Sequence, residues 1–425
     1  MSKKIQTVRG MKDILPDIWP YYDFIFKEAE NVLKNAGFSR ISTPILEFSE
    51  LFQRTVGDAT DIIEKEMYVF QDKGGDEVCL KPEMTAPICR SYIQNGMETW
   101  PKPVKVFYIE PNFRYERPQK GRQRQFWQIG FEILGVQDPI VDAETINLAL
   151  MLLSSWGIKE YLLKINSIGC LNCRKKYRKA LVDYYNNHFD EICDDCKRRI
   201  LKNPLRVLDC KNKKCSNIKR EAPQILDYLC NDCSEHFKGV LEYLDDLNIN
   251  YDLDPFLVRG LDYYTRTVFE IICLDDEDLA LGSGGRYDDL IEMLGGEKTP
   301  GCGVAFGVER LINFLQEKKI PIKYEKPQGV FVVQIGDRAR KKALLLVKML
   351  REAGIFADCD LSNKSLKSQL KLVDKMGFPL ALILGEKEVV EDAVILKDMS
   401  SGIQKTIKGG EIISEVQKRL PRQVT

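Results

Sequence analysis

The sequence predicts an α+β fold: an antiparallel sheet flanked by helices, interrupted by a helical insertion and followed by a separate α/β domain. Three observations indicate this arrangement. Between residues 104 and 134, two β-rich runs flank a polar, basic loop, which is typical of an antiparallel hairpin. Residues 170–240 are rich in cysteine and largely helical in pattern. After residue 327, apolar strands alternate with helical stretches, which indicates parallel pairing within a small independent unit.

Length and composition place the chain among ordinary globular proteins. Its 425 residues exceed what one hydrophobic core usually supports, so two or three domains are expected. With 44% hydrophobic and 30% charged residues, it has neither a disordered nor a membrane composition. No apolar run approaches the ~18 residues of a membrane span, and the first residues lack the hydrophobic core of a signal peptide. We therefore expect a cytoplasmic protein without a membrane partner.

The charge is balanced overall but unevenly distributed. The formal net charge is zero, yet residues 170–240 carry 16 Lys and Arg against 10 Asp and Glu, and residues 327–425 carry 17 against 12. The rest of the chain is therefore acidic. Two basic modules suit contact with a long polyanion at two separated places. Lysine-rich solvated faces that arose by chance are the alternative interpretation.

Local patterns predict the individual elements in order. Aromatic and aliphatic residues recur at helical spacing over residues 17–36. Residues 41–48 are typical of an edge strand, because Pro44 interrupts them. Strands and glycine-rich turns return over residues 252–315, where an amphipathic helix begins at about Val308 and continues to Lys318.

The C-terminal region has a different character. A proline-bearing linker over residues 320–327 precedes it. Residues 329–335 and 380–384 are continuous apolar runs, and helical patterns cover residues 338–353 and 364–376. This alternation predicts a parallel sheet with helices on its faces.

The second run of the hairpin, residues 123–134, has a two-faced pattern. Its odd positions from 127 to 133 are apolar and are expected to face a core. Its even positions Gln128, Gly130 and Glu132 leave a concave spot that offers an amide and a carboxylate. On the first run, Arg114 shares a face with Glu110 and Asn112. A pocket between Arg114 and Glu132 would hold a phosphate at one end and a hydrogen-bonding group at the other. For either strand alone, a solvated sheet face is the alternative.

Cysteine and histidine usage limits the chemistry. The chain has thirteen cysteines but only two histidines, both in the cysteine-rich segment, which makes Ser-His-Asp or Cys-His catalysis improbable. Eight cysteines fall in four closely spaced pairs, which suit two closed structural zinc sites. The pairs are Cys170 and Cys173, Cys193 and Cys196, Cys210 and Cys215, and Cys230 and Cys233. Reduced thiols without metal are the alternative, and the spacing does not say which pairs share an ion.

Several segments resemble motifs of class II aminoacyl-tRNA synthetases. Residues 113–126, which read FRYERPQKGRQRQF, resemble motif 2, and residues 301–310 resemble motif 3. Residues 41–44 fit the motif 1 region, whose proline lies at the dimer interface in that class. Residues 257–270, LVRGLDYYTRTVFE, are similar to a segment peculiar to histidyl-tRNA synthetases. Residues 8–13 and 284–288 fit the same family, so the resemblance runs essentially from end to end.

The resemblance implies an ATP-dependent ligase that activates L-histidine and attaches it to tRNA(His), with Mg²⁺ accompanying ATP. It places Arg114 on the α-phosphate, Arg310 on the γ-phosphate, and Arg259 between the histidine carboxylate and the α-phosphate. Arg114 and Arg259 are thus the expected catalytic residues, and Glu116 and Arg122 complete the expected ATP site. Because activation joins two anions, charge neutralisation and alignment matter more than proton transfer.

The resemblance also implies a histidine pocket. Its expected residues are Glu83, Thr85, Gln128, Glu132, Arg259, Tyr263 and Tyr264. Glu83, Thr85 and Gln128 are assigned to the ammonium group, and Glu132 and Tyr264 to the imidazole ring. Gly284, Gly285 and Arg286 are expected to complete the wall. A pocket that hydrogen-bonds both ring nitrogens rejects other amino acids strongly, because unmatched polar groups would remain buried. For the two tyrosines, ordinary core aromatics are the alternative.

The resemblance further implies a homodimer with four segments. These are a catalytic domain over residues 1–169 and 241–320, a Cys-rich helical insertion over residues 170–240 and an anticodon-binding α/β domain over residues 327–425. Gln119 and Arg122, in the basic hairpin loop, are expected to contact the tRNA acceptor end.

Two other functions compete with the ligase. One is a non-catalytic synthetase-like regulatory subunit of histidine biosynthesis, and the other is a zinc-dependent nucleic-acid-binding protein with an inactive synthetase fold. Such regulatory subunits usually lack the catalytic arginine and the C-terminal domain, whereas Arg259 and residues 327–425 are both present here. The full set of ATP-site arginines argues against the inactive fold.

Overall fold

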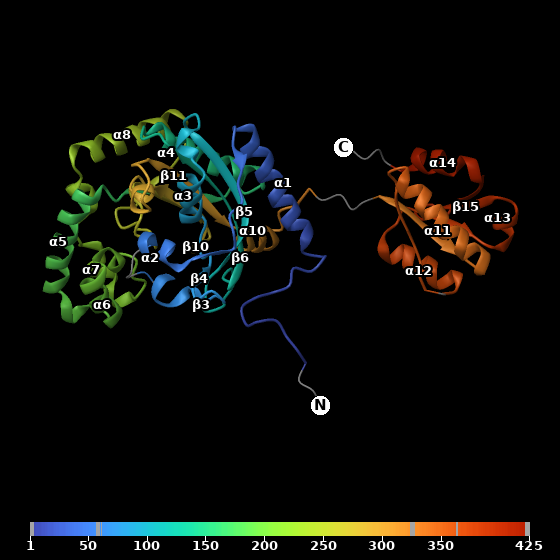
Figure 1. The fold of residues 1–425 in the computed structure, drawn as a ribbon, viewed down its shortest axis with the longest axis horizontal. Helices are drawn as coiled ribbons and strands as arrows, with labels where there is room; N and C mark the ends of the chain where they lie inside the picture. The colour runs from blue at the N-terminus through green and yellow to red at the C-terminus, as the bar shows by residue number, and fades with distance from the viewer. Residues whose placement is uncertain (1–3, 57–59, 61, 324–327, 363, 421–425) are drawn as a thin grey trace. The chain divides into compact units, whose positions relative to one another are not determined.

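The computed structural model describes residues 4–56, 60, 62–323, 328–362 and 364–420. The chain forms two compact units, Met1–Ile322 and Lys323–Thr425, each with hydrophobic cores of its own (Figure 1). Residues 324–327 of the predicted linker lie outside the described residues. Among the described residues, no helix combines the length and the hydropathy that crossing a membrane requires.

An eight-stranded sheet forms the centre of the first unit. In spatial order its strands are β1 (Ser39–Arg40), β5 (Val104–Phe113), β6 (Gln125–Leu134), β11 (Gly301–Gly307), β10 (Asp276–Arg286), β9 (Thr265–Cys273), β7 (Tyr161–Ser167) and β8 (Asp252–Leu253). The six central strands pair antiparallel, which confirms the predicted hairpin and sheet. Both edges differ from the prediction, because β1 and β8 pair parallel with their neighbours. A long connection precedes each parallel pairing, and such a connection is what parallel strands require.

Helices cover both faces of this sheet. One face packs against α1 (Trp19–Asn35), α4 (Ile140–Ser155), α8 (Asn231–Asp246) and α10 (Val308–Glu317). The other packs against α2 (Ser49–Val56), α3 (Thr85–Gln94) and α9 (Leu290–Met293). On β6, Ile129, Phe131 and Ile133 are buried in the first core, as the odd positions predict. The even positions therefore face the second layer, where the site lies.

The segment around Pro44 divides between two sheets. After β1, the chain continues into β2 (Leu46–Phe48), which is an edge strand of a small antiparallel sheet with β4 (Glu77–Leu80) and β3 (Tyr68–Gln71). Within the predicted segment 41–48 only β2 forms a strand, and its edge placement is as predicted, whereas β1 ends before residue 41. The proline lacks the N–H that a continuous strand would use.

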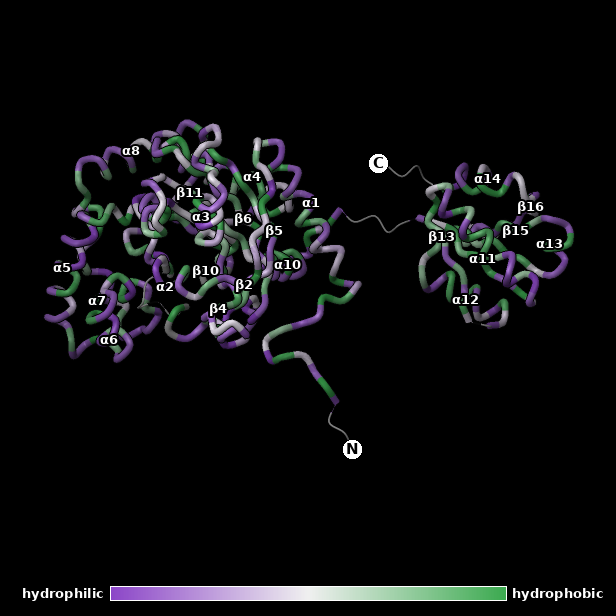
Figure 2. Tube along the Cα trace, in the orientation of Figure 1, coloured by the Kyte–Doolittle hydropathy of each residue, from purple (hydrophilic) through white to green (hydrophobic). Residues whose placement is uncertain are grey.

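The Cys-rich insertion is helical, as predicted. Its helices are α5 (Leu171–Asn187), α6 (Asp194–Lys202) and α7 (Ser216–Arg220), and α8 returns the chain to the sheet. Tyr177, Leu181, Tyr185 and Ile200 belong to a separate small core. Hydrophilic residues predominate along α5 and α6 (Figure 2).

Short helical turns complete the connections of the chain. The 3-10 turns are Met97–Thr99, Phe189–Glu191, Pro204–Val207, Lys213–Cys215, Ile225–Tyr228 and Gly409–Glu411, and one π-helical turn spans Ile62–Glu66.

The second unit is a five-stranded sheet with helices. Its strands, in spatial order, are β13 (Phe356–Cys359), β12 (Gly329–Gln334), β14 (Leu380–Leu384), β15 (Ala393–Asp398) and β16 (Gln404–Lys408). Its helices are α11 (Asp337–Glu352), α12 (Leu366–Met376), α13 (Glu386–Val390) and α14 (Ile412–Arg419). The predicted parallel pairing of β12 with β14 is confirmed. The sheet is not wholly parallel as predicted, because β15 pairs antiparallel with both β14 and β16.

Candidate active site

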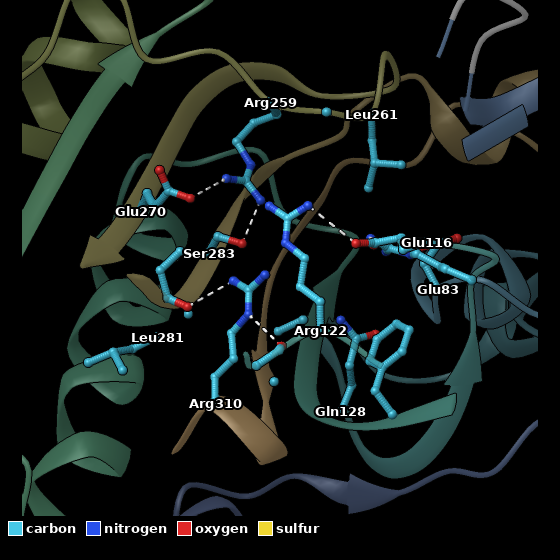
Figure 3. Close-up of a pocket in the computed structure, with 18 of the residues that line it drawn as sticks. Glu83, Glu116, Arg122, Gln128, Arg259, Leu261, Glu270, Leu281, Ser283 and Arg310 are labelled. Carbon is cyan, nitrogen blue, oxygen red and sulfur yellow. Dashed lines mark hydrogen bonds and ion pairs between the residues drawn. The ribbon is translucent and has the colours of Figure 1, made fainter. Parts of the chain in front are cut away.

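A cavity of about 570 Å³ opens on the sheet face that α2, α3 and α9 cover, and β5, β6, β9, β10 and β11 contribute to its lining (Figure 3). The predicted site residues that line it are Glu83, Thr85, Arg114, Glu116, Arg122, Gln128, Arg259, Tyr263, Tyr264 and Arg310. Glu132 and Gln119 are not in the lining. The sheet thus brings together groups from four segments far apart in the sequence.

One end of the cavity is crowded with arginines. Arg310, in the first turn of α10, donates from Nε to the carbonyl oxygen of Gly121 (3.3 Å) and from Nη1 to that of Ala280 (3.0 Å). Burial lowers the pKa of Arg310, and the positive charges of Arg122 and Arg114 lower it further. Like charges held this close repel each other, and a bound polyanion would relieve that repulsion.

Glu116 stands between two of these arginines. Its Oε1 lies 3.8 Å from Nη1 of Arg114, and its Oε2 lies 3.3 Å from Nη1 of Arg122 (Figure 3). Arg114 also donates from Nε to the carbonyl oxygen of Pro82 at 2.9 Å. These contacts orient both guanidinium groups while leaving several of their N–H donors for a ligand.

Arg259 enters the cavity from the opposite wall. Its Nη1 lies 3.4 Å from Oε1 of Glu270, and its Nη2 donates to Oγ of Ser283 (Figure 3). The guanidinium carbon lies 5.6 Å from the centre of the Tyr264 ring. Nε of Arg259 is buried and has no hydrogen-bond acceptor among the described residues. A buried donor without an acceptor is costly, so an anionic ligand would complete this site.

Glu83 and the start of α3 form the other end. The Glu83 carboxylate accepts hydrogen bonds from the backbone N–H groups of Thr85 and Ala86, each at 2.8 Å, and from the Tyr263 hydroxyl at 3.1 Å. Burial raises the pKa of Glu83, and these three hydrogen bonds oppose that rise. The carboxylate therefore lies in a fixed position at a helix N-terminus, where negative charge is favoured.

Glu132 lies directly behind the lining. Its Oε1 accepts from the Thr85 hydroxyl at 2.9 Å, and its Oε2 accepts from the Tyr287 hydroxyl. Burial raises the pKa of Glu132 to about 8, against the effect of both hydroxyls, which lower it. With a pKa of about 8 the group is mainly protonated near neutral pH, and its proton occupies one of the roughly four lone-pair positions. The two hydroxyls use two others, so one position can still accept a hydrogen bond.

Gln128 and Tyr264 complete the polar wall. Oε1 of Gln128 accepts from Nδ2 of Asn112 on β5 at 2.7 Å, which leaves the Gln128 amide N–H groups toward the cavity. Burial raises the pKa of Tyr264 to about 12. Its hydroxyl is therefore protonated near neutral pH and can donate a hydrogen bond.

The expectation that Arg286 completes the pocket wall is wrong. Arg286 is fully buried away from the cavity and is paired with two carboxylates: its Nε lies 2.9 Å from Oδ2 of Asp142, and its Nη1 lies 3.0 Å from Oδ1 of Asp288. Gly284 and Gly285, on the same strand, do not line the cavity either. Arg286 lies on the face of β10 that packs against α4, whereas Gly285 lies on the opposite face beside Val268 and Tyr264, and a local motif does not reveal this division.

The hairpin loop between β5 and β6 presents Gln119 to solvent. The backbones of Gln119 and Arg122 exchange hydrogen bonds of 3.2 and 2.9 Å, so the loop closes on itself. Gly121, at φ +71°, provides the left-handed turn inside it. Gln119 is exposed and is not part of the cavity lining, while Arg122 belongs to it.

Comparison with known proteins shows the family of this chain. Residues 10–311 match the histidyl-tRNA synthetase family, and residues 329–419 match the anticodon binding domain. The chain belongs to the histidyl-tRNA synthetase family. A histidine–tRNA ligase of Clostridium novyi is 46% identical over 400 residues, which cover 94% of this chain and 95% of the relative. A histidine–tRNA ligase of Halothermothrix orenii is 45% identical, and the alignment covers 97% of this chain and 99% of the relative.

The structure of the apo histidyl-tRNA synthetase of S. aureus aligns with a TM-score of 0.82 at 35% identity, covering 97% of this chain and all of that one. The predicted α+β class, with the helical insertion and the C-terminal α/β domain, is therefore confirmed as that of the family.

Within this histidyl-tRNA synthetase fold, several residues in or behind the cavity lining had no role assigned from the sequence. Glu270 and Ser283 line the cavity and orient Arg259, and the insertion adds Lys211 and Lys219 to the lining. Tyr287, outside the lining, holds Glu132. Glu270 and Tyr287 belong to segments that carry the family resemblance, so position in a motif was the available signal. The lysines carry no such signal, because only folding brings the insertion to the cavity.

The eight cysteines of the insertion form two groups. Cys170, Cys173, Cys230 and Cys233 gather at its base, and the remaining four gather around α6. All are reduced, and none lines the cavity.

Proposed function

We propose that this chain is a histidine–tRNA ligase that forms histidyl-adenylate from L-histidine and ATP and transfers the histidyl group to tRNA(His). The single observation that carries the proposal is the polarity of the cavity. One end presents arginine donors to a polyphosphate, and the other presents a carboxylate, an amide and tyrosine hydroxyls to a small amphoteric ligand. Family membership makes histidine and ATP the pair that fits these ends.

In the proposed activation step, a histidine carboxylate oxygen attacks the α-phosphorus of ATP. The new bond joins carboxyl oxygen to phosphorus, the bond from that phosphorus to the bridging oxygen breaks, and pyrophosphate leaves with its electron pair. Arg114 and Arg259 approach the α-phosphate from opposite walls, and Arg310 receives the γ-phosphate. The orphan Nε of Arg259 supports this role, because charge developing on the α-phosphate would supply the missing acceptor.

Selection of histidine is proposed to occur at the Glu83 end. Glu83, Thr85 and Gln128 would hold the ammonium group, with Tyr263 fixing Glu83 through its 3.1 Å hydrogen bond. Glu132 would accept one imidazole N–H at a free lone-pair position, and the Tyr264 hydroxyl would donate to the other ring nitrogen. An amino acid without two ring nitrogens would leave both groups unmatched in a buried site.

The ATP is proposed to enter with Mg²⁺. Glu116 and Glu270 are lining carboxylates that contact the cavity arginines, and oxygen donors of this kind suit Mg²⁺ shared with phosphates. When bound, the ion neutralises phosphate charge. Glu116 and Glu270 also orient the arginines, so no separate acidic cage is needed.

The tRNA and the dimer extend this proposal beyond the cavity. Gln119 and Arg122 of the exposed loop would meet the acceptor end, and residues 327–425 would bind the anticodon, in keeping with the family match of that segment. A homodimer is supported by exposed apolar side chains of the small sheet, at Ile45, Phe48 and Phe70. We propose the cytoplasm as the site of action.

The decisive test is ATP–pyrophosphate exchange with each of the twenty standard amino acids. We expect exchange with L-histidine alone. Exchange with another amino acid would contradict the assignment, and histidine binding without exchange in a folded protein would indicate a regulatory subunit instead.

A further inference from the structure

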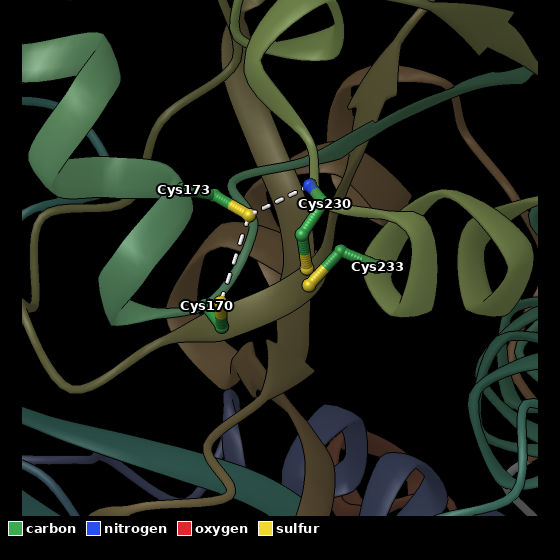
Figure 4. Close-up of side chains that lie close together, drawn as sticks. All are labelled: Cys170, Cys173, Cys230 and Cys233. Atoms are coloured by element: carbon green, nitrogen blue, oxygen red, sulfur yellow. Dashed lines mark hydrogen bonds between the residues drawn. The ribbon is translucent and has the colours of Figure 1, made fainter.

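We propose that the insertion holds two structural zinc ions, each bound by four cysteine thiolates. Cys170 and Cys173 share the first ion with Cys230 and Cys233 (Figure 4), and Cys193 and Cys196 share the second with Cys210 and Cys215. In sequence order, the first cysteine pair therefore shares an ion with the fourth pair, and the second shares an ion with the third. This assignment is independent of the proposed ligase activity, because it concerns metal content.

The spacing of the sulfur atoms fits tetrahedral zinc. In each group the four sulfurs lie within 4.8 Å of one another. The Sγ atoms of Cys170 and Cys173 are 3.6 Å apart, those of Cys193 and Cys210 are 3.8 Å apart, and those of Cys196 and Cys215 are 3.8 Å apart. Zinc–sulfur bonds of about 2.3 Å at tetrahedral angles place sulfurs roughly 3.8 Å apart. A disulfide would require about 2.05 Å, so this arrangement does not correspond to disulfides.

Backbone groups point at the sulfurs as they do around thiolate ligands. The N–H of Cys230 donates to Sγ of Cys173 at 3.0 Å (Figure 4), the N–H of Cys193 to Sγ of Cys215 at 3.3 Å, and the N–H of Asn212 to Sγ of Cys210 at 3.4 Å. Backbone N–H groups that donate to the ligand sulfurs stabilise the negative charge that four thiolates bring to Zn²⁺.

Helix ends provide a second source of stabilisation. Cys170, Cys193 and Cys230 are the N-cap residues of α5, α6 and α8, three helices of nine or more residues. The positive end of each helix dipole therefore lies beside a ligand sulfur. Each of these caps makes no side-chain hydrogen bond of its own to the helix, so the thiol is not needed for capping.

The two sites have different mechanical roles. The second lies inside the small core of the insertion, which includes Cys196 and Cys215. A core of this size stabilises a segment with 16 basic residues only weakly, and a bound metal ion would add the missing stability. The first site joins the two ends of the insertion, because Cys170 follows β7 after two residues of connection and Cys233 lies in the first turn of α8.

The first site also lies close to the segment that carries Arg259 and the tyrosines. Arg266, at the start of β9, donates its N–H to the carbonyl oxygen of Gly169 at 3.0 Å. Arg174 of α5 donates to the carbonyl oxygen of Asp262 at 3.1 Å. The ion at this site would therefore fix how the insertion meets the active-site segment, while the ion itself stays outside the cavity.

The test is metal analysis of the full-length protein, purified without chelators from cells supplied with zinc. We expect two zinc ions per chain and sulfur-only ligation by X-ray absorption. Iron in place of zinc, nitrogen or oxygen ligands, or a metal-free protein with eight rapidly reacting thiols in the insertion would overturn the proposal. This measurement uses the wild-type chain and does not depend on any variant folding.

The pairing is tested by replacing whole pairs with serine. Loss of Cys170, Cys173, Cys230 and Cys233 together is expected to leave one zinc, whereas loss of Cys170, Cys173, Cys193 and Cys196 is expected to leave none. If the first and second pairs shared an ion, the second variant would keep one zinc and the first would keep none. If the first and third pairs shared an ion, both variants would keep none. Cys359→Ser, in the other unit, is the control and should keep two.

Discussion

Gly303 on β11 lies directly opposite Glu132 on β6, and a Cβ at Gly303 would lie 1.6 Å from Oε2 of Glu132. The carboxylate thus occupies the space over β11 that a side chain would take. Glycine is required here by close approach, since no positive φ is involved. The position of the group proposed to read the imidazole ring therefore depends on a residue that contacts no substrate.

We expect Gly303→Ala to weaken histidine binding much more than ATP binding. The added methyl must displace the carboxylate, and overpacking of this kind also costs about 1–3 kcal/mol of stability. The KM for histidine in pyrophosphate exchange and the Kd by calorimetry measure the effect. Gly410→Ala, where nothing lies within 4 Å of the added Cβ, is the control and should behave as wild type. An unchanged histidine KM would show that Glu132 has no part in binding.

Glu132→Gln tests the ionisation of the same carboxylate. Since burial raises the pKa of Glu132 to about 8, the folded state binds this proton more tightly than the unfolded state, where the pKa is about 4.3. The contribution of Glu132 to the free energy of unfolding is fully present at low pH, where the group is protonated in both states. Between about pH 4 and pH 8 the unfolded state ionises first, and the free energy of unfolding falls by up to about 1.4 kcal/mol per pH unit.

The glutamine cannot ionise, so the variant should gain stability relative to wild type as the pH rises from 6 to 8. Denaturant unfolding without ligands at both pH values measures the difference, and the exposed Glu98→Gln is the control. A constant difference between variant and wild type would mean that Glu132 ionises normally. Histidine-dependent exchange should fall in the same variant.

Arg259→Ala is expected to lower kcat of exchange by about 100-fold or more, with a smaller loss of histidine binding. The reason is that the guanidinium acts mainly as charge develops on the α-phosphate. Thermal stability should change little, since its partner Glu270 is partly exposed and can be hydrated. Steady-state exchange kinetics provide the measurement, and Arg198→Ala, on the surface of the insertion, is the control. A higher KM at constant kcat would instead indicate ground-state binding.

Truncation after Ile322 should spare adenylate formation far more than tRNA charging. Every residue proposed to bind ATP or histidine belongs to the first unit, which has its own cores. The removed unit would supply anticodon contacts, whose phosphate component weakens with salt. Both activities are compared in the intact and truncated chains after the oligomeric state of each has been checked.

In the intact chain, charging should fall more steeply with salt than exchange does. Equal loss of both activities in a well-folded truncated dimer would mean that the second unit supports the active site. Unchanged charging would mean that it does not bind tRNA.

The sequence by itself determined the elements whose signal is local. The two-residue alternation of β6, the helical spacing of α1 and the polar loop between the two hairpin runs are properties of neighbouring residues. Each of these predicted elements formed at nearly the predicted bounds. The motifs also identified the family, because the residues that bind a ligand are constrained in type and spacing within short segments.

Only the tertiary structure determined the contacts between segments far apart in the sequence, because no repeating local pattern links such segments. Arg286 and Asp142 lie 144 positions apart, and only the packing of α4 against β10 makes them a buried pair instead of a pocket wall. The four cysteine pairs have nearly equal spacing, so their grouping depends on how α5 and α8 meet at the base of the insertion. The parallel edges of the eight-stranded sheet likewise follow from where long connections return the chain.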